Sequence, residues 1–252
     1  MSTSSIRERL ALDHFYIPAS ADELGALSKM TSGLRDSSYS RIVSGDDHWE
    51  GVYIPSRTGD YFEIVHYPRA APLGLAFSPA KPQYTDARKL AKEFPALAWK
   101  RGSRLTDTHQ PWFDWLSLSD DADPTFPPIK AWAMHYHFTH WPQSTTPSGP
   151  RVIDRFKRVE LILGRDIVPS LRALVPWIPG SQRWGDGKIA LVLPLRDGHE
   201  LLIDIRLKDG DERLSFLSLE MEITRGQDIA PGKFGPFELA MTAAHTAVFR
   251  KL

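Results

Sequence analysis

At 252 residues the chain is long enough for one large domain or for two units of about 100 residues each. Its 31 Lys and Arg residues balance its 31 Asp and Glu residues, so no net charge draws it to nucleic acid or to an anionic membrane. The absence of cysteine excludes disulfides, thiolate metal ligands and a cysteine nucleophile. No apolar run approaches the roughly 20 residues of a membrane span, and we expect a cytoplasmic protein.

Residues 1–80 are predicted to form a strand, a helix and three further strands. The strand at 12–17 (LDHFYI) is rich in aromatic and β-branched residues and ends before Pro18. The helix at 20–30 begins at Ser20, a favourable N-cap, and carries apolar residues at helical spacing. The three strands follow at 48–56, 60–68 and 73–79, and a turn at 57–59 joins the first two into a hairpin.

Residues 151–252 repeat that order. A strand is predicted at 156–163 and a helix at 166–177, whose first turn tolerates Pro169. Three strands follow, joined by Asp-Gly turns, at 188–195, 199–207 and 213–223. The segments GPFELAM and TAVFRKL near the C-terminus are predicted to add edge strands.

Residues 81–150 lie between the two repeats and are rich in aromatic side chains. They contain a helical run at 85–94 and the aromatic segments 111–118 and 129–141, and a linker rich in Pro, Ser and Thr at 142–150. Trp112 and Trp115 either line a pocket or close a core. We expect this segment to pack against the rim of a ligand cleft.

The repeat predicts an α+β fold of two βαβββ modules. A helix covers one face of each sheet and leaves the other face open, so two modules must pair to form a stable structure. We therefore expect curved mixed sheets around a cleft, with a first module at 1–80, an aromatic-rich insertion at 81–150 and a second module at 151–252. Pairing within one chain and pairing across a homodimer both remain open.

The strands LDHFYI, YFEIVHY and GLAFS, in this order, resemble a module of the vicinal oxygen chelate superfamily. That superfamily includes glyoxalase I, extradiol dioxygenases, and the fosfomycin and bleomycin resistance proteins. Together with PWFDW and AWAMHYHF farther on, the first half is similar to an uncharacterised glyoxalase-like group within it. The resemblance covers residues 1–80 best, and the second repeat matches by topology more than by residues.

The resemblance implies a divalent metal held by a ligand from the first strand and a glutamate from the third. His14 falls on the first position and Glu63 on the second. Strand alternation places His14 on the same face as Tyr16, and Glu63 on the same face as Tyr61. An imidazole and a carboxylate suit Zn, Fe, Mn or Ni. Glu63 is also the candidate catalytic residue.

The second module departs from this pattern. The position that corresponds to His14 lies near Val159, and no histidine aligns there. Asp204 lies on the polar face of a later strand and is a candidate pocket residue, together with Tyr16, Tyr61 and the two tryptophans. A metal site with four ligands, as in glyoxalase I, is therefore not expected.

The segment AMHYHFTHW contains His135 and His137, which share a face if residues 131–139 form a strand. One of them could complete a set of two histidines and one carboxylate with His14 and Glu63. The alternative is that both make ordinary hydrogen bonds among the surrounding aromatic side chains. We favour the second reading, because a pair of histidines alone is common and non-specific.

Three functions fit these residues. The first is a metal-dependent lyase, isomerase or dioxygenase-like enzyme acting on a small oxygen-rich substrate. The second is a metal-free protein that sequesters a small molecule, as the bleomycin resistance proteins do. The third is a structural subunit whose cleft is closed by its own insertion. The metal content of the purified protein separates the first reading from the other two.

Overall fold

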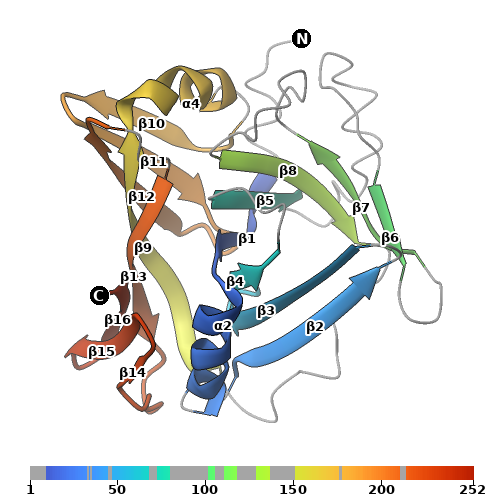
Figure 1. Ribbon diagram of the computed structural model, residues 1–252, viewed down its shortest axis with the longest axis vertical. Coiled ribbons are helices and arrows are strands. Elements are labelled where there is room, and N and C mark those ends of the chain that lie inside the picture. The colour runs from blue at the N-terminus through green and yellow to red at the C-terminus, as the bar shows by residue number, and fades with distance from the viewer. Residues whose placement is uncertain are drawn as a thin grey trace.

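The structure is a computed structural model of residues 1–252 (Figure 1). It describes residues 10–32, 34, 36–44, 47–67, 73–79, 102–105, 111–117, 129–136, 151–175, 178–210 and 214–252. Most of this part of the chain is β-strand. None of its helices combines the length and the apolar character that a membrane crossing would need.

The first sheet is formed by strands that precede residue 137. Its order is β2-β3-β4-β1-β5-β8-β7-β6. β1 lies inside the sheet, parallel to β4 on one side and antiparallel to β5 on the other. The bounds are β1 Leu10–Pro18, β2 Ser38–Ser44, β3 Asp47–Pro55, β4 Tyr61–His66, β5 Leu73–Pro79, β6 Gly102–Leu105, β7 Pro111–Ser117 and β8 Ile129–Tyr136.

The second sheet repeats this arrangement with later strands. Its order is β10-β11-β12-β9-β13-β16-β15-β14, and β9 is parallel to β12 and antiparallel to β13. The bounds are β9 Ile153–Gly164, β10 Ser181–Gly185, β11 Lys188–Pro194, β12 Glu200–Lys208, β13 Leu214–Ile223, β14 Gly232–Phe234, β15 Phe237–Ala243 and β16 Thr246–Lys251. The two segments predicted as C-terminal strands correspond to β15 and β16.

Each sheet begins with a βαβββ unit. In the first, β1 leads through α2 (Ala21–Leu27) and the 3-10 turn η1 (Ser28–Ser32) to β2, β3 and β4. In the second, β9 leads through η4 (Arg165–Ile167) and α4 (Val168–Leu174) to β10, β11 and β12. In both, the strand before the helix lies parallel to the last strand of the unit. Mixed sheets built on βαβββ units are therefore confirmed.

The grouping of strands within the units differs from the prediction. Residues 73–79 and 213–223 are predicted as the last strands of the two units, whereas β5 and β13, which they form, each start the other half of a sheet. In the two units their places are taken by β2 and β10, neither of which is predicted from the sequence. Both are edge strands, and β10 is exposed at every position, so it carries no alternation of apolar and polar residues to detect.

Residues 81–150 contribute strands to the first sheet. β8 pairs in parallel with β5, and β7 and β6 continue the sheet to its edge. An aromatic-rich insertion separate from the sheet is therefore not confirmed. The helix predicted at 85–94 and the linker predicted at 142–150 lie outside the described residues.

The start of α2 is fixed by a capping box. The backbone N–H of Glu23 donates to the Ser20 hydroxyl at 3.2 Å, and the backbone N–H of Ser20 donates to the Glu23 carboxylate at 2.8 Å. Leu24 and Leu27 are buried on the inner side of the helix. The predicted N-cap is confirmed, and the capping box orients this helix against the first sheet.

The two sheets share an aromatic core. Phe15 of β1 and Phe62 of β4 stack at 4.9 Å between ring centroids. Phe15 also contacts Phe156 of β9 at 5.5 Å, and Phe62 contacts Phe216 and Phe249 of the second sheet at 6.0 and 6.1 Å. In Figure 1 α2 lies between the sheets. Because alternate residues of a strand point to opposite faces, His14 and Glu63 lie on the face of the first sheet that turns away from this core.

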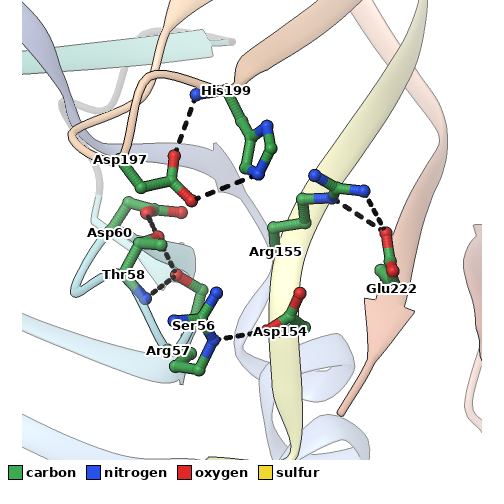
Figure 2. Close-up of polar contacts among 9 residues, drawn as sticks. All are labelled: Ser56, Arg57, Thr58, Asp60, Asp154, Arg155, Asp197, His199 and Glu222. Atoms are coloured by element: carbon green, nitrogen blue, oxygen red, sulfur yellow. Dashed lines mark hydrogen bonds and ion pairs between the residues drawn. The ribbon is translucent and has the colours of Figure 1, made fainter. Parts of the chain in front are cut away.

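A polar seam joins the sheets at the turn between β3 and β4 (Figure 2). Arg57 forms an ion pair with Asp154 of β9, and its backbone N–H donates to the carbonyl of Ile153 at 2.9 Å. In the same turn the Thr58 hydroxyl donates to the buried carboxylate of Asp60. The seam fixes this turn against the start of the second sheet.

Candidate functional site

The register of the first sheet brings the predicted residues onto one face. His14 of β1 lies opposite Tyr61 of β4, and Tyr16 lies opposite Glu63. On the other side of β4, Glu63 lies opposite Tyr53 of β3. Paired residues point to the same face of a sheet, and so do residues two apart on one strand. The five side chains therefore gather over β1, β3 and β4.

His14 is held by a carboxylate and by two rings. A β-bulge between Leu12 and His14 inserts Asp13 as an extra residue in β1. Asp13 Oδ1 lies 2.8 Å from His14 Nδ1. Tyr61 stacks on the imidazole, and Trp132 of β8 meets it edge-on with centroids 5.5 Å apart. These contacts fix the ring plane and engage Nδ1, so Nε2 is the nitrogen left for a ligand.

Glu63 is buried, with 7% of its surface exposed. Burial raises the pKa of its carboxyl, because a buried charge loses its hydration, while nearby His14 and a hydrogen bond from Tyr53 oppose this rise. Burial and the charge of Glu63 together raise the pKa of Tyr53, whose hydroxyl also accepts from Trp49 Nε1 at 3.2 Å. The buried carboxyl of Glu63 would therefore be stabilised either by a cation beside it or by a bound proton.

Two glycines leave room for these side chains. A Cβ at Gly51 would lie 3.1 Å from Glu63 Oε1 and 3.2 Å from the ring of Tyr53. A Cβ at Gly74 of β5 would lie 2.0 Å from Tyr16 Cε1, because the Tyr16 ring covers that glycine. Tyr16 also meets Trp132, with ring centroids 5.8 Å apart. The face next to His14 is therefore walled by aromatic rings.

No contact of the described residues places the remaining predicted residues on this face of the first sheet. Asp204 lies on β12 of the second sheet and forms an ion pair with Arg158 at 2.5 Å. Trp112 and Trp115 belong to β7, and His135 belongs to β8 opposite Asp114, but their side chains are outside the described residues. His137 is outside them altogether. Among the described residues, no group of three His, Asp or Glu side chains is arranged to hold a metal.

The second sheet places charged pairs where the first has its site. The last residue pair between β1 and β4 is Pro18–Val65, and the last pair between β9 and β12 is Gly164–Lys208. When these two pairs are aligned, Glu160 corresponds to His14 and Arg206 corresponds to Glu63. Asp204 likewise corresponds to Tyr61. Arg206 lies 3.4 Å from Glu160, and the Ser218 hydroxyl donates to Glu160 at 3.0 Å. Cation and carboxylate already neutralise each other there, so this face is not a second copy of the site.

Sequence reasoning misses Asp13, Tyr53 and Gly51 as parts of the site. Asp13 stands beside His14 in the motif LDH, but strand alternation alone sends its side chain to the opposite face. Only the bulge in β1 brings the carboxylate to the imidazole. Tyr53 and Gly51 lie on β3 within a buried run that carries no distinguishing signal.

The topology decides the fold. The first strand of each βαβββ unit pairs in parallel with its last, and β1 joins β5 at the centre of an eight-stranded sheet. This agrees with the βαβββ modules that the resemblance in the sequence predicts. No family model and no curated protein matches the chain.

Several solved structures are similar to this chain at low sequence identity. A xylose isomerase-like TIM barrel/4-hydroxyphenylpyruvate dioxygenase fusion protein is 9% identical with a TM-score of 0.38; the match covers 79% of this chain and 32% of that one. Homoprotocatechuate 2,3-dioxygenase from Arthrobacter globiformis is 12% identical with a TM-score of 0.33, covering 83% and 81%. A catechol 2,3-dioxygenase is 10% identical with a TM-score of 0.29, covering 89% and 96%. Likenesses this distant do not bear on the activity of this chain.

Proposed function

We propose that the face of the first sheet between β3 and β8 is a small-molecule site at which His14 and Glu63 hold a divalent metal ion. The observation that carries the proposal is the contact of 2.8 Å between Asp13 Oδ1 and His14 Nδ1 beside a buried glutamate. Histidines that bind metals almost always engage their second nitrogen with a carboxylate or a carbonyl, which orients the ring and raises its basicity.

The chemistry of the described residues fits a metal in part. His14 and Glu63 offer one nitrogen and one carboxylate, a donor set suited to Zn, Fe, Mn or Ni. A cation would also offset the burial that raises the pKa of Glu63. The other coordination positions would fall to water, to the substrate, or to a residue outside the described side chains such as His135 or His137. When bound, the ion would act as a Lewis acid toward substrate oxygens.

The other residues of the site favour a planar or oxygen-rich molecule. Tyr16, Tyr61 and Trp132 form an aromatic wall that would stack on a ring and exclude water. Glu63 would accept or return a proton at the carboxylate oxygen that the metal leaves free, and Tyr53 would hold that carboxylate in place. This arrangement supports a lyase, isomerase or dioxygenase-like reaction.

The test is metal binding by protein purified without a His-tag. We expect elemental analysis to find a stoichiometric divalent ion, and calorimetry to show that Zn²⁺ or Mn²⁺ binds the metal-stripped protein. Both His14→Ala and Glu63→Ala should abolish binding while circular dichroism shows an intact fold. Asp204→Asn is the matched control, because it removes a carboxylate from the second sheet and should leave binding unchanged.

A second candidate is a metal-free binding site on the same face. It is favoured by one observation: Glu63 already has Tyr53 and His14 as partners, so a proton can take the place of a metal. If the folded wild-type protein binds none of Zn²⁺, Mn²⁺, Fe²⁺ or Ni²⁺, the metal proposal is wrong. Quenching of tryptophan fluorescence by small aromatic acids would then support sequestration without catalysis.

A further inference from the structure

We propose that Arg196, which the second sheet contributes, is a positioning residue for His14. This inference rests on the proposed role of His14, although it does not depend on whether the occupant of the site is a metal. Arg196 lies 183 residues from Asp13 in the sequence, yet its Nη2 donates to Asp13 Oδ2. The residue therefore reaches the candidate site from the other half of the chain.

A tight turn presents Arg196 to the first sheet. It lies in the turn between β11 and β12, which is closed by the backbone hydrogen bond from Leu195 N to His199 O at 2.8 Å. Gly198, with a φ of 84°, takes the left-handed conformation that this turn needs. The Arg196 side chain is one-third exposed, with 33% of its surface accessible, whereas Asp13 is 2% exposed. A rigid hairpin thus delivers a cation to a buried carboxylate.

The guanidinium makes several contacts at the end of the first sheet. Besides Asp13, it meets the Ser78 hydroxyl of β5, with Nη2 at 2.7 Å and Nε at 3.2 Å. A Cβ at Gly59 would lie 3.6 Å from Nη1, so the same group also borders the β3–β4 turn. Arg196 is therefore anchored by hydrogen bonds on two strands of the first sheet, β1 and β5, and this position leaves Asp13 little freedom to rotate.

The two oxygens of Asp13 are divided between Arg196 and His14. Oδ2 accepts from the guanidinium, and Oδ1 faces His14 Nδ1 at 2.8 Å. A carboxylate can only accept hydrogen bonds, so Nδ1 carries a proton, and in the neutral imidazole Nε2 then keeps its lone pair. A guanidinium that fixes the rotation of Asp13 thereby selects the tautomer of His14 that can bind a metal or accept a proton from a substrate.

The alternative is that Arg196 only links the two sheets and has no effect on His14. The Arg57–Asp154 ion pair offers the comparison, because it also joins the sheets and makes no contact with His14, Asp13 or Glu63 among the described contacts. If Arg196 only joins the sheets, replacing either arginine should have the same effect on the site. If it positions His14, only its own replacement should change the imidazole.

The experiment is ¹⁵N NMR of the imidazole nitrogens in the metal-stripped protein, with His14 assigned by the His14→Gln spectrum. In the wild type and in Arg57→Ala we expect the shifts of the Nδ1–H tautomer. In Arg196→Ala we expect a mixture of tautomers, and affinity for Zn²⁺ lower by about 10- to 100-fold. Arg196→Lys should restore the tautomer in part, and guanidinium added at millimolar concentration should do so for the alanine variant.

The imidazole shifts test the positioning role of Arg196, and metal binding separately tests the proposed metal site. Unchanged His14 shifts in a folded Arg196→Ala protein would overturn the positioning role, whatever the metal affinity. Changed shifts in a protein that binds no metal would support the positioning role and reject the metal. If Arg196→Ala does not fold, Ser78→Ala with Arg196→Lys loosens the same anchor, and unchanged shifts there would also overturn the inference.

Discussion

Tyr61 lies flat against His14, with ring centroids 4.4 Å apart and planes inclined by 15°. The two residues are direct neighbours across β1 and β4, so strand register alone brings the rings together. The stack covers one face of the imidazole, and Asp13 engages Nδ1, so Nε2 is the remaining ring nitrogen. Tyr61 is thus both part of the packing and part of the site.

We predict that Tyr61→Ala weakens both stability and binding. Removing a buried aromatic side chain should lower the free energy of unfolding by about 3–5 kcal/mol, as measured by urea denaturation. Tyr61→Phe keeps the ring and should lose far less than the alanine variant. Equal losses in the two variants would show that the hydroxyl, and not the stack, is what matters.

Glu63 should make stability depend on pH. Its folded-state pKa is raised above the ordinary value of 4.5, so the folded protein holds a proton that the unfolded chain releases. The stability that the protonated Glu63 contributes is therefore fully present below pH 4.5 and is lost as the pH rises through the folded-state pKa. Glu63→Gln should gain stability relative to wild type over that window, by at most about 1.4 kcal/mol per pH unit for one proton.

The measurement is urea unfolding of both metal-stripped proteins from pH 4 to 8. The same comparison in a His14→Gln background shows whether the effect of Glu63 depends on its neighbour His14. Asp60, whose pKa burial also raises, is present in both proteins and so cancels. A difference between wild type and Glu63→Gln that stays constant across the range would contradict a buried acid with a raised pKa.

Gly51→Ala should damage the site more than the fold. The new Cβ would press on Glu63 Oε1 and on the Tyr53 ring, at 3.1 and 3.2 Å, so one of these side chains must move. We expect a loss of about 1–3 kcal/mol in stability and a loss of ligand binding. Gly25→Ala is the matched control, since nothing lies within 4 Å of its Cβ, and it should stabilise α2 by about 0.5–1 kcal/mol.

Gly74→Ala should be costly only while Tyr16 is present. Its Cβ would overlap the Tyr16 ring at 2.0 Å from Cε1, which forces the ring off the sheet. In a double-mutant cycle the loss of stability from Gly74→Ala should shrink in the Tyr16→Ala background. Additive effects of the two substitutions in urea unfolding would mean that the ring moves aside freely.

Much of the first unit is predictable because its signals are local. The Ser20 and Glu23 caps, the turn at Gly59, and the apolar runs of β1, β4 and β5 each lie within a few residues of sequence. Edge strands such as β10 lack a buried face, and their pairing is invisible in sequence. His14 and Glu63 follow from motif and alternation, whereas the bulge at Asp13 depends on pairing with β5.

Because Arg196 of the second sheet donates to Asp13 of the first, the candidate site needs both halves of the chain. A fragment ending at residue 150 would keep His14, Asp13 and Glu63, but it would lose the guanidinium that Asp13 accepts from. It would also uncover Phe15 and Phe62, whose partners Phe156, Phe216 and Phe249 come from the other half. Transplanting the site to another scaffold would therefore require both sheets, even though every ligand candidate lies in one.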